Sequence, residues 1–75
     1  MADQWQATVR FVFDGTTKRR VFRAAEISSQ TFAEVGDQGP EKRVLVECFD
    51  ELGELVESFQ CLGGIVHKVR VGGGG

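Results

Sequence analysis

The chain has 75 residues, of which 41% are hydrophobic and 27% are charged, and a formal net charge of −2 at pH 7. This length allows one domain, near the lower size limit for folding alone. The slightly negative charge argues against a dedicated nucleic-acid binder, which would normally be basic. No apolar stretch is long enough to span a membrane and no signal peptide opens the chain, so we expect a cytoplasmic protein with no membrane partner.

The first predicted element is a strand over residues 4–13, where polar and apolar residues alternate. Its apolar face collects Trp5, Ala7, Val9, Phe11 and Phe13, and Val12 is the apolar exception on the polar face. Asp14 and Gly15 follow and predict a hairpin turn, because glycine tolerates the positive φ that such turns need. The chain then returns as a strand over residues 18–25, and the sequence leaves open whether the loop has two or four residues.

Residues 26–38 fit two different structures. In a helix, Ser28 or Ser29 would cap the first turn and Gly36 would end the last one. In a strand, residues 30–35 are rich enough in Thr, Phe and Val to qualify. The pattern alone does not choose between the two.

A second hairpin is predicted over residues 43–50 and 55–62, around Leu52 and Gly53. This pairing sets three pairs opposite one another: Cys48 and Glu57, Val46 and Phe59, Val44 and Cys61. One face then becomes a core face, made of Val44, Val46, Cys48, Leu55, Phe59 and Cys61. The opposite face keeps three apolar residues that are either covered by another element or exposed as a binding patch, namely Leu45, Phe49 and Val56.

The chain ends with a predicted strand over residues 65–71, which alternates, and then four glycines over residues 72–75. Four glycines bury nothing, and fully extended they would carry the terminal carboxylate roughly 14 Å beyond the strand. Such a tail could enter a narrow enzyme site without a clash. The other interpretation is that some or all of these glycines are a cloning linker.

A domain of this length that opens with a strand and a tight turn, and closes with a strand carrying Arg70 before a glycine tail, resembles the ubiquitin-like proteins. The resemblance covers length, order of elements and residues 69–75, and not the body of the chain. It implies an α+β fold, the β-grasp, in which a mixed sheet wraps one short helix, here at residues 28–35. Without that helix the chain is an all-β small antiparallel barrel or sandwich. Either way we expect one globular domain over residues 1–71 and a flexible tail over residues 72–75.

The resemblance also implies a function. The chain would be a protein modifier and not an enzyme, activated at the carboxylate of Gly75 and transferred to an amine or sulfur acceptor, with Gly72, Gly73 and Gly74 as the flexible lead. Its partners would be an adenylating enzyme and a downstream transfer enzyme or target protein, with no cofactor. Arg70 would help the activating enzyme to recognise the chain, and hairpin parity adds four candidate partner-binding residues: Leu45, Phe49, Val56 and Val66.

Two other functions remain open. The chain could be a small β-rich protein-interaction or self-assembling module with an incidental tail, which would use its sheet edges and the surface of Leu45, Phe49 and Val56. We otherwise expect a monomer. A weaker hypothesis is single-stranded nucleic-acid binding, suggested by the basic stretch at residues 18–23 beside Phe11 and Phe13.

Two cysteines in a chain without a secretion signal are predicted to be free thiols. Their spacing with His67 matches no zinc pattern, so we expect no metal. Cys48 and Cys61 both fall on the predicted core face, where a free cysteine behaves as a small apolar residue. We expect His67 to be a partly buried strand residue.

Overall fold

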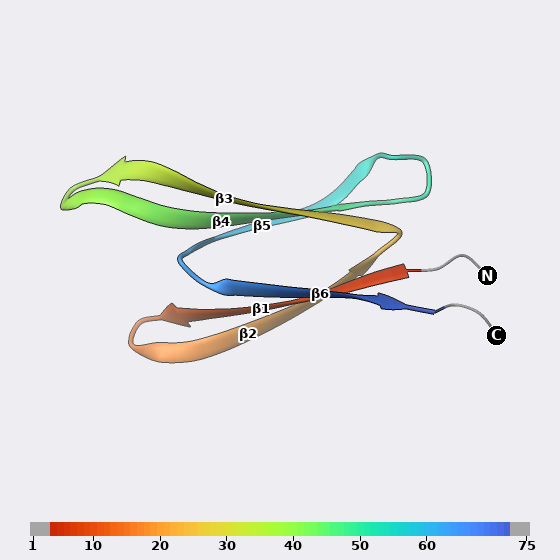
Figure 1. Cartoon of the computed structure of the whole chain (residues 1–75), viewed down its shortest axis with the longest axis horizontal. Coiled ribbons are helices and arrows are strands. Elements are labelled where there is room, and N and C mark those ends of the chain that lie inside the picture. The colour runs from red at the N-terminus through yellow and green to blue at the C-terminus, as the bar shows by residue number, and fades with distance from the viewer. Residues whose placement is uncertain (1–3, 73–75) are drawn as a thin grey trace.

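The structure, a computed structural model, describes residues 4–72. These residues form six strands: β1 Gln4–Phe13, β2 Thr16–Ala24, β3 Glu26–Gly36, β4 Gly39–Phe49, β5 Leu55–Leu62 and β6 Ile65–Val71. The strands make two three-stranded sheets, sheet A in the order β2-β1-β6 and sheet B in the order β3-β4-β5, and all pairs are antiparallel. Figure 1 shows the two sheets as two layers of a sandwich.

The predicted β-grasp is wrong, and the all-β alternative fits. Residues 28–35, which the β-grasp needs as a helix, lie within β3, which pairs with β4 along its whole length, from Glu26 opposite Phe49 to Gly36 opposite Gly39. The tertiary setting decides what the sequence left open. A two-residue turn at Asp37 and Gln38 brings β4 back alongside, and the Thr, Phe and Val side chains of this segment suit a pleated surface better than a helix. No helix long and apolar enough to cross a bilayer occurs within residues 4–72.

The first hairpin confirms the predicted bounds of β1 and settles the length of its loop. Phe13 lies opposite Thr16, so the loop has the two residues Asp14 and Gly15. Their φ angles are 52° and 74°, which is the left-handed pair that the commonest two-residue hairpin turn requires.

The second hairpin confirms the three predicted residue pairs across β4 and β5, but its turn is longer than predicted. A register shift between Cys48 and Phe49 sets Phe49 opposite Leu55, so Leu55 leaves the core face and is 52% exposed. The carboxylate of Asp50 accepts hydrogen bonds from two backbone N–H groups of the turn, at 2.9 Å each. This side-chain capping stabilises a loop that the simple two-residue interpretation missed.

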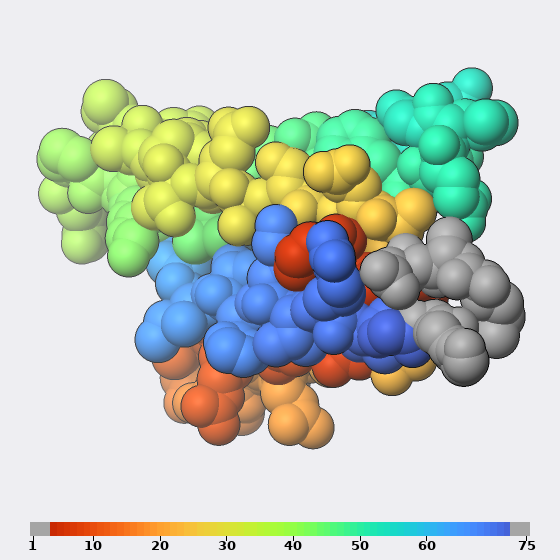
Figure 2. Space-filling model, turned by 45° about the vertical axis from the view of Figure 1, so that its right-hand side comes forward, coloured from red at the N-terminus to blue at the C-terminus, as the bar shows by residue number. Residues whose placement is uncertain are grey.

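The chain passes from one sheet to the other at two places, Ala25 between β2 and β3 and the Gly63–Gly64 pair between β5 and β6. The core lies between the sheets and consists of small and medium apolar side chains: Ala7, Val9, Phe22, Ala24, Ile27, Val44, Val46, Cys48 and Cys61. The β3–β4 hairpin is longer than the sheet beneath it, and Figure 2 shows its tip extending past the layer that contains β6.

Candidate protein-interaction surface

Cations that point inward protect the two edge strands of sheet A. On β2, the guanidinium of Arg20 lies 5.2 Å from the ring centroid of Phe59 and 3.9 Å from the carboxylate of Glu57. On β6, the ammonium of Lys68 donates a 3.1 Å hydrogen bond to the backbone carbonyl of Ile27 in the other sheet. Inward-pointing charges on edge strands prevent unwanted pairing with other chains, because an added strand would have to bury them.

One stretch of backbone lacks this protection. The pairing of β6 with β1 ends where Ile65 faces Arg10, and residues 11–13 of β1 pair with β2 alone within residues 4–72. A Cβ atom placed on Gly64 would lie 2.9 Å from the carbonyl oxygen of Arg10, so that carbonyl points to the β6 side. Backbone groups alternate along an antiparallel strand, and the N–H and C=O of Val12 therefore point to the same, unpaired side.

Apolar side chains surround this free backbone. We call the region formed by Phe11, Val12, Phe13, Leu62 and Ile65 the open end. Val12, Phe13 and Leu62 are each more than half exposed, and Ile65 is 71% exposed. Figure 1 places the β1–β2 turn and the β5–β6 connection on the same side of the sandwich.

Two hollows flank the open end and share Phe11, Val12 and Leu62. The first, of about 620 Å³, also contacts Arg10 and the Gly63–Gly64 crossing. The second, of about 560 Å³, lies toward the inside of the sandwich. Its floor is aromatic, since the ring centroids of Phe11 and Phe59 are 5.3 Å apart. The open end thus combines free backbone groups with apolar space on either side of them.

The residues that the sequence proposed for partner binding do not share one surface. Leu45 and Phe49 lie half-buried on the outer face of sheet B, and Val56 is 60% exposed beside the bulge of β5. Val66 turns inward and packs against the core, opposite Val9. The guanidinium of Arg70 also turns inward and lies 5.0 Å from the ring centroid of Trp5.

The sequence reasoning missed the open end, although one signal for it was present. Val12 is the apolar exception on an otherwise polar strand face, and the structure leaves it 63% exposed. What the sequence does not contain is the point at which β6 stops pairing. Without it, residues 11–13 look like the continuation of a fully paired strand.

The modifier hypothesis loses its fold argument, because the β-grasp is absent from the described part of the chain. Its reacting group also falls outside that part: Gly73, Gly74 and Gly75 lie beyond the described residues, while Gly72 is exposed after β6. The hypothesis remains a prediction that rests on the glycine tail, and loss of thioester formation on deletion of Gly75 is its direct test.

Both cysteines are free and buried, as predicted. Burial raises the pKa of both thiols above 9.0, and the nearby carboxylate of Glu57 adds to the effect at Cys48. The thiol of Cys61 donates to the backbone carbonyl of Gly63 at 3.0 Å. Protonated, enclosed thiols are poor nucleophiles and poor metal ligands, and no group of three potential metal ligands occurs within residues 4–72.

His67, expected to be partly buried, is exposed on the outer face of sheet A.

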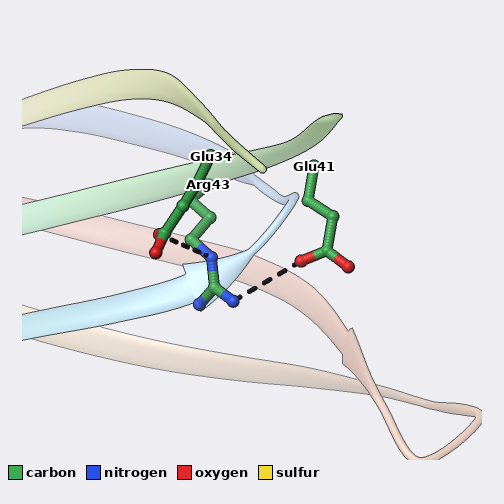
Figure 3. A network of polar contacts seen from close by, with 3 residues as sticks. All are labelled: Glu34, Glu41 and Arg43. Carbon is green, nitrogen blue, oxygen red and sulfur yellow. Dashed lines mark hydrogen bonds and ion pairs between the residues drawn. The ribbon is translucent and has the colours of Figure 1, made fainter. Parts of the chain in front are cut away.

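Arg43 stabilises the part of the β3–β4 hairpin near its turn through two ion pairs (Figure 3). Its guanidinium lies 3.1 Å from the carboxylate of Glu34 through Nε and 3.5 Å from that of Glu41 through the terminal nitrogen. The Nε–H is not aligned with Glu34, so that contact is an ion pair without a hydrogen bond. Glu34 and Glu41 face each other across the hairpin, and Arg43 offsets their repulsion.

No family model matches this chain, and searches of curated proteins and of solved structures find no match to it either.

Proposed function

We propose that this chain is a small protein-interaction module that binds an extended segment of a partner protein at its open end. The observation that carries the proposal is the unpaired backbone of Val12, flanked by two apolar hollows. An extended peptide adds to a free sheet edge through main-chain hydrogen bonds, and pockets for its alternate side chains provide selectivity.

The incoming segment would lie beside residues 11–13 of β1, in line with β6. Its side chains would alternate between the two faces of sheet A. One set enters the inner hollow over Phe11 and Phe59, and the other enters the outer hollow beside Val12 and Ile65. The partner segment is therefore apolar on both faces, unlike a typical half-exposed strand.

Only a few backbone bonds contribute to this contact, each worth about 0.5–1.5 kcal/mol net. Burial of the exposed apolar side chains of the open end adds about 25 cal/mol per Å² of covered surface. A short contact of this kind gives affinities on the order of micromolar, which suits a module that engages and releases its partner.

The test uses short peptides selected from a random library on the wild-type chain. Selected peptides are expected to contain an uninterrupted apolar run. In NMR titrations, their binding should shift the amide signals of residues 11–13 and 62–65 of the protein. The decisive variant is Val12→Pro, which removes an N–H on the unpaired side and leaves the β1–β2 ladder bonded. It should weaken binding about tenfold or more, the equivalent of roughly 1.4 kcal/mol.

Val12→Thr is the matched control, because it keeps the backbone N–H and the branched shape of the side chain. It should bind within about threefold of wild type, since the main chain provides most of the contact at this position. Equal affinities for the Val12→Pro variant and the wild type, with both folded by circular dichroism, would rule out strand addition at this edge.

A further inference from the structure

All the charged strand residues on the outer face of sheet A are cations. Strand register places the residues that point away from sheet B on this face, which we call the cationic face; its charged members are Arg10, Arg19 and Arg23. The three strands of sheet A contain no Asp or Glu, so the formal charge of this strand face is +3. Arg10 and Arg19 are directly opposite each other, an arrangement that costs stability in an isolated sheet.

The outer face of sheet B has the opposite charge, and we call it the acidic face. By the same register its charged residues are Glu26, Glu34, Glu41, Glu47 and Arg43. Four carboxylates and one guanidinium give a formal charge of −3. Glu34 and Glu41 are engaged by Arg43, whereas Glu26 and Glu47 have no ion pair within residues 4–72.

We propose that copies of this chain stack face to face, the cationic face of one copy against the acidic face of the next. Equal and opposite charges on the two outer faces identify the partner as a second copy. A symmetric contact would set like charges against each other, so the stack is head-to-tail, and this type of contact extends into an open row of copies. The contact is separate from the open end and does not depend on the partner-binding function proposed for it.

Both faces also carry apolar residues that such a contact would cover. Val21 and Val69 on the cationic face are exposed, and Leu45 and Phe49 on the acidic face are half-buried. The edge strands β2 and β6, in contrast, are protected by inward-pointing Arg20 and Lys68. For contacts between copies, the outer faces and not the β2 and β6 edges are therefore the surfaces that suit association.

The size of the faces makes the contact weak. Three strands about 4.8 Å apart and about seven residues long, at 3.4 Å per residue, cover roughly 14 by 24 Å, or about 340 Å². A stable interface buries about 800 Å² on each partner. We therefore expect association only near millimolar concentration and at low ionic strength, because added salt screens exposed charges over about 8–10 Å.

The test uses two charge-reversed variants that each leave the open end intact. Arg19→Glu/Arg23→Glu makes both outer faces negative, and Glu26→Lys/Glu47→Lys makes both positive while keeping the ion pairs of Arg43. Sedimentation at low salt should show concentration-dependent association for the wild type and only the 8.2 kDa monomer for either variant alone. An equimolar mixture of the two variants should associate again, because each then offers a face that complements the other.

The control variant, Glu51→Lys/Glu54→Lys, changes the net charge as much as the acidic-face variant does. It alters only the exposed β4–β5 loop, so it should associate as the wild type does. A wild type that stays monomeric at about 1 mM in low salt would overturn the proposal, since this is the weakest affinity that the geometry supports. Variants that associate alone, or a mixture that does not, would overturn it as well.

Discussion

Replacement of Gly64 by alanine should destabilise the fold more than the same replacement at the other glycines of positive φ. Gly64 has a φ of 119°, a conformation that residues with a Cβ rarely adopt. An added Cβ would also lie 2.9 Å from the carbonyl oxygen of Arg10 and 3.3 Å from the sulfur of Cys61. The first neighbour is backbone at the end of the β1–β6 ladder, so it cannot move without loss of strand pairing.

A control for the backbone strain is available within the same chain. Gly39 has a similar φ of 109°, but nothing lies within 4 Å of its added Cβ. Gly39→Ala should therefore cost about 1–3 kcal/mol from strain alone. Gly64→Ala should cost the same amount plus the collision, which is of the order of 1–3 kcal/mol for overpacking.

The size of this difference matters because the whole domain is small. A chain of this length is stable by about 4–11 kcal/mol, so Gly64→Ala removes a large share of the total. Urea unfolding followed by the fluorescence of Trp5, the one tryptophan of the chain, measures both variants. Equal free energies of unfolding for the two variants, within about 0.5 kcal/mol, would refute the close approach of Gly64 to β1.

Two further predictions concern the contacts between the sheets. Lys68→Met removes the hydrogen bond to the carbonyl of Ile27 and should lower the free energy of unfolding by about 1–2 kcal/mol. The control is Lys42→Met at an exposed position, which should change the free energy of unfolding by less than about 0.5 kcal/mol in the same urea titration. Burial raises the pKa of Cys48 and Cys61, so the folded state keeps its thiol protons to higher pH than the unfolded chain does. The contribution of the protonated thiols to the free energy of unfolding is complete below the ordinary pKa of 9.0 and is lost as the pH rises toward the raised pKa values. Unfolding titrations between about pH 8 and 10 should therefore show a falling free energy of unfolding, and Cys48→Ala should make its dependence on pH less steep. A slope unchanged in Cys48→Ala would show that this thiol does not contribute.

Short-range patterns predicted the hairpins well. The alternation over residues 4–13 and the Asp14–Gly15 pair determine β1 and its turn, and the bounds of β5 and β6 also agree with the prediction. The helix expected at residues 28–35 was wrong for a reason that lies outside the segment itself. Thr31 and Val35 fit one helical face only if that face is covered, and in the structure both are exposed on a hairpin that extends past its neighbouring sheet.

The candidate site was harder to predict, because it depends on where pairing stops. Hairpin parity correctly placed Leu45 on an outer face, but it also proposed Val66, which turns inward because its direction is set by pairing with distant Val9. The bulge after Cys48 likewise moved Leu55 out of the core without any marker in the local alternation. Contacts between residues far apart in sequence decide the direction of Val66 and the point at which β6 stops pairing with β1.

The glycine pair that connects sheet B to sheet A also creates the open end. The glycine pair at residues 63 and 64 lets β5 cross to the other sheet within two residues, and this early crossing starts β6 opposite Arg10. Because β1 continues for three more residues, the crossing leaves Val12 with unpaired backbone. Elsewhere sheet A protects its edges with inward cations, at Arg20 and Lys68, so within sheet A the exposure of this edge is a local property of the crossing. A longer linker in place of the glycine pair should let β6 start earlier and cover Val12, and peptide binding should then fall without loss of the fold.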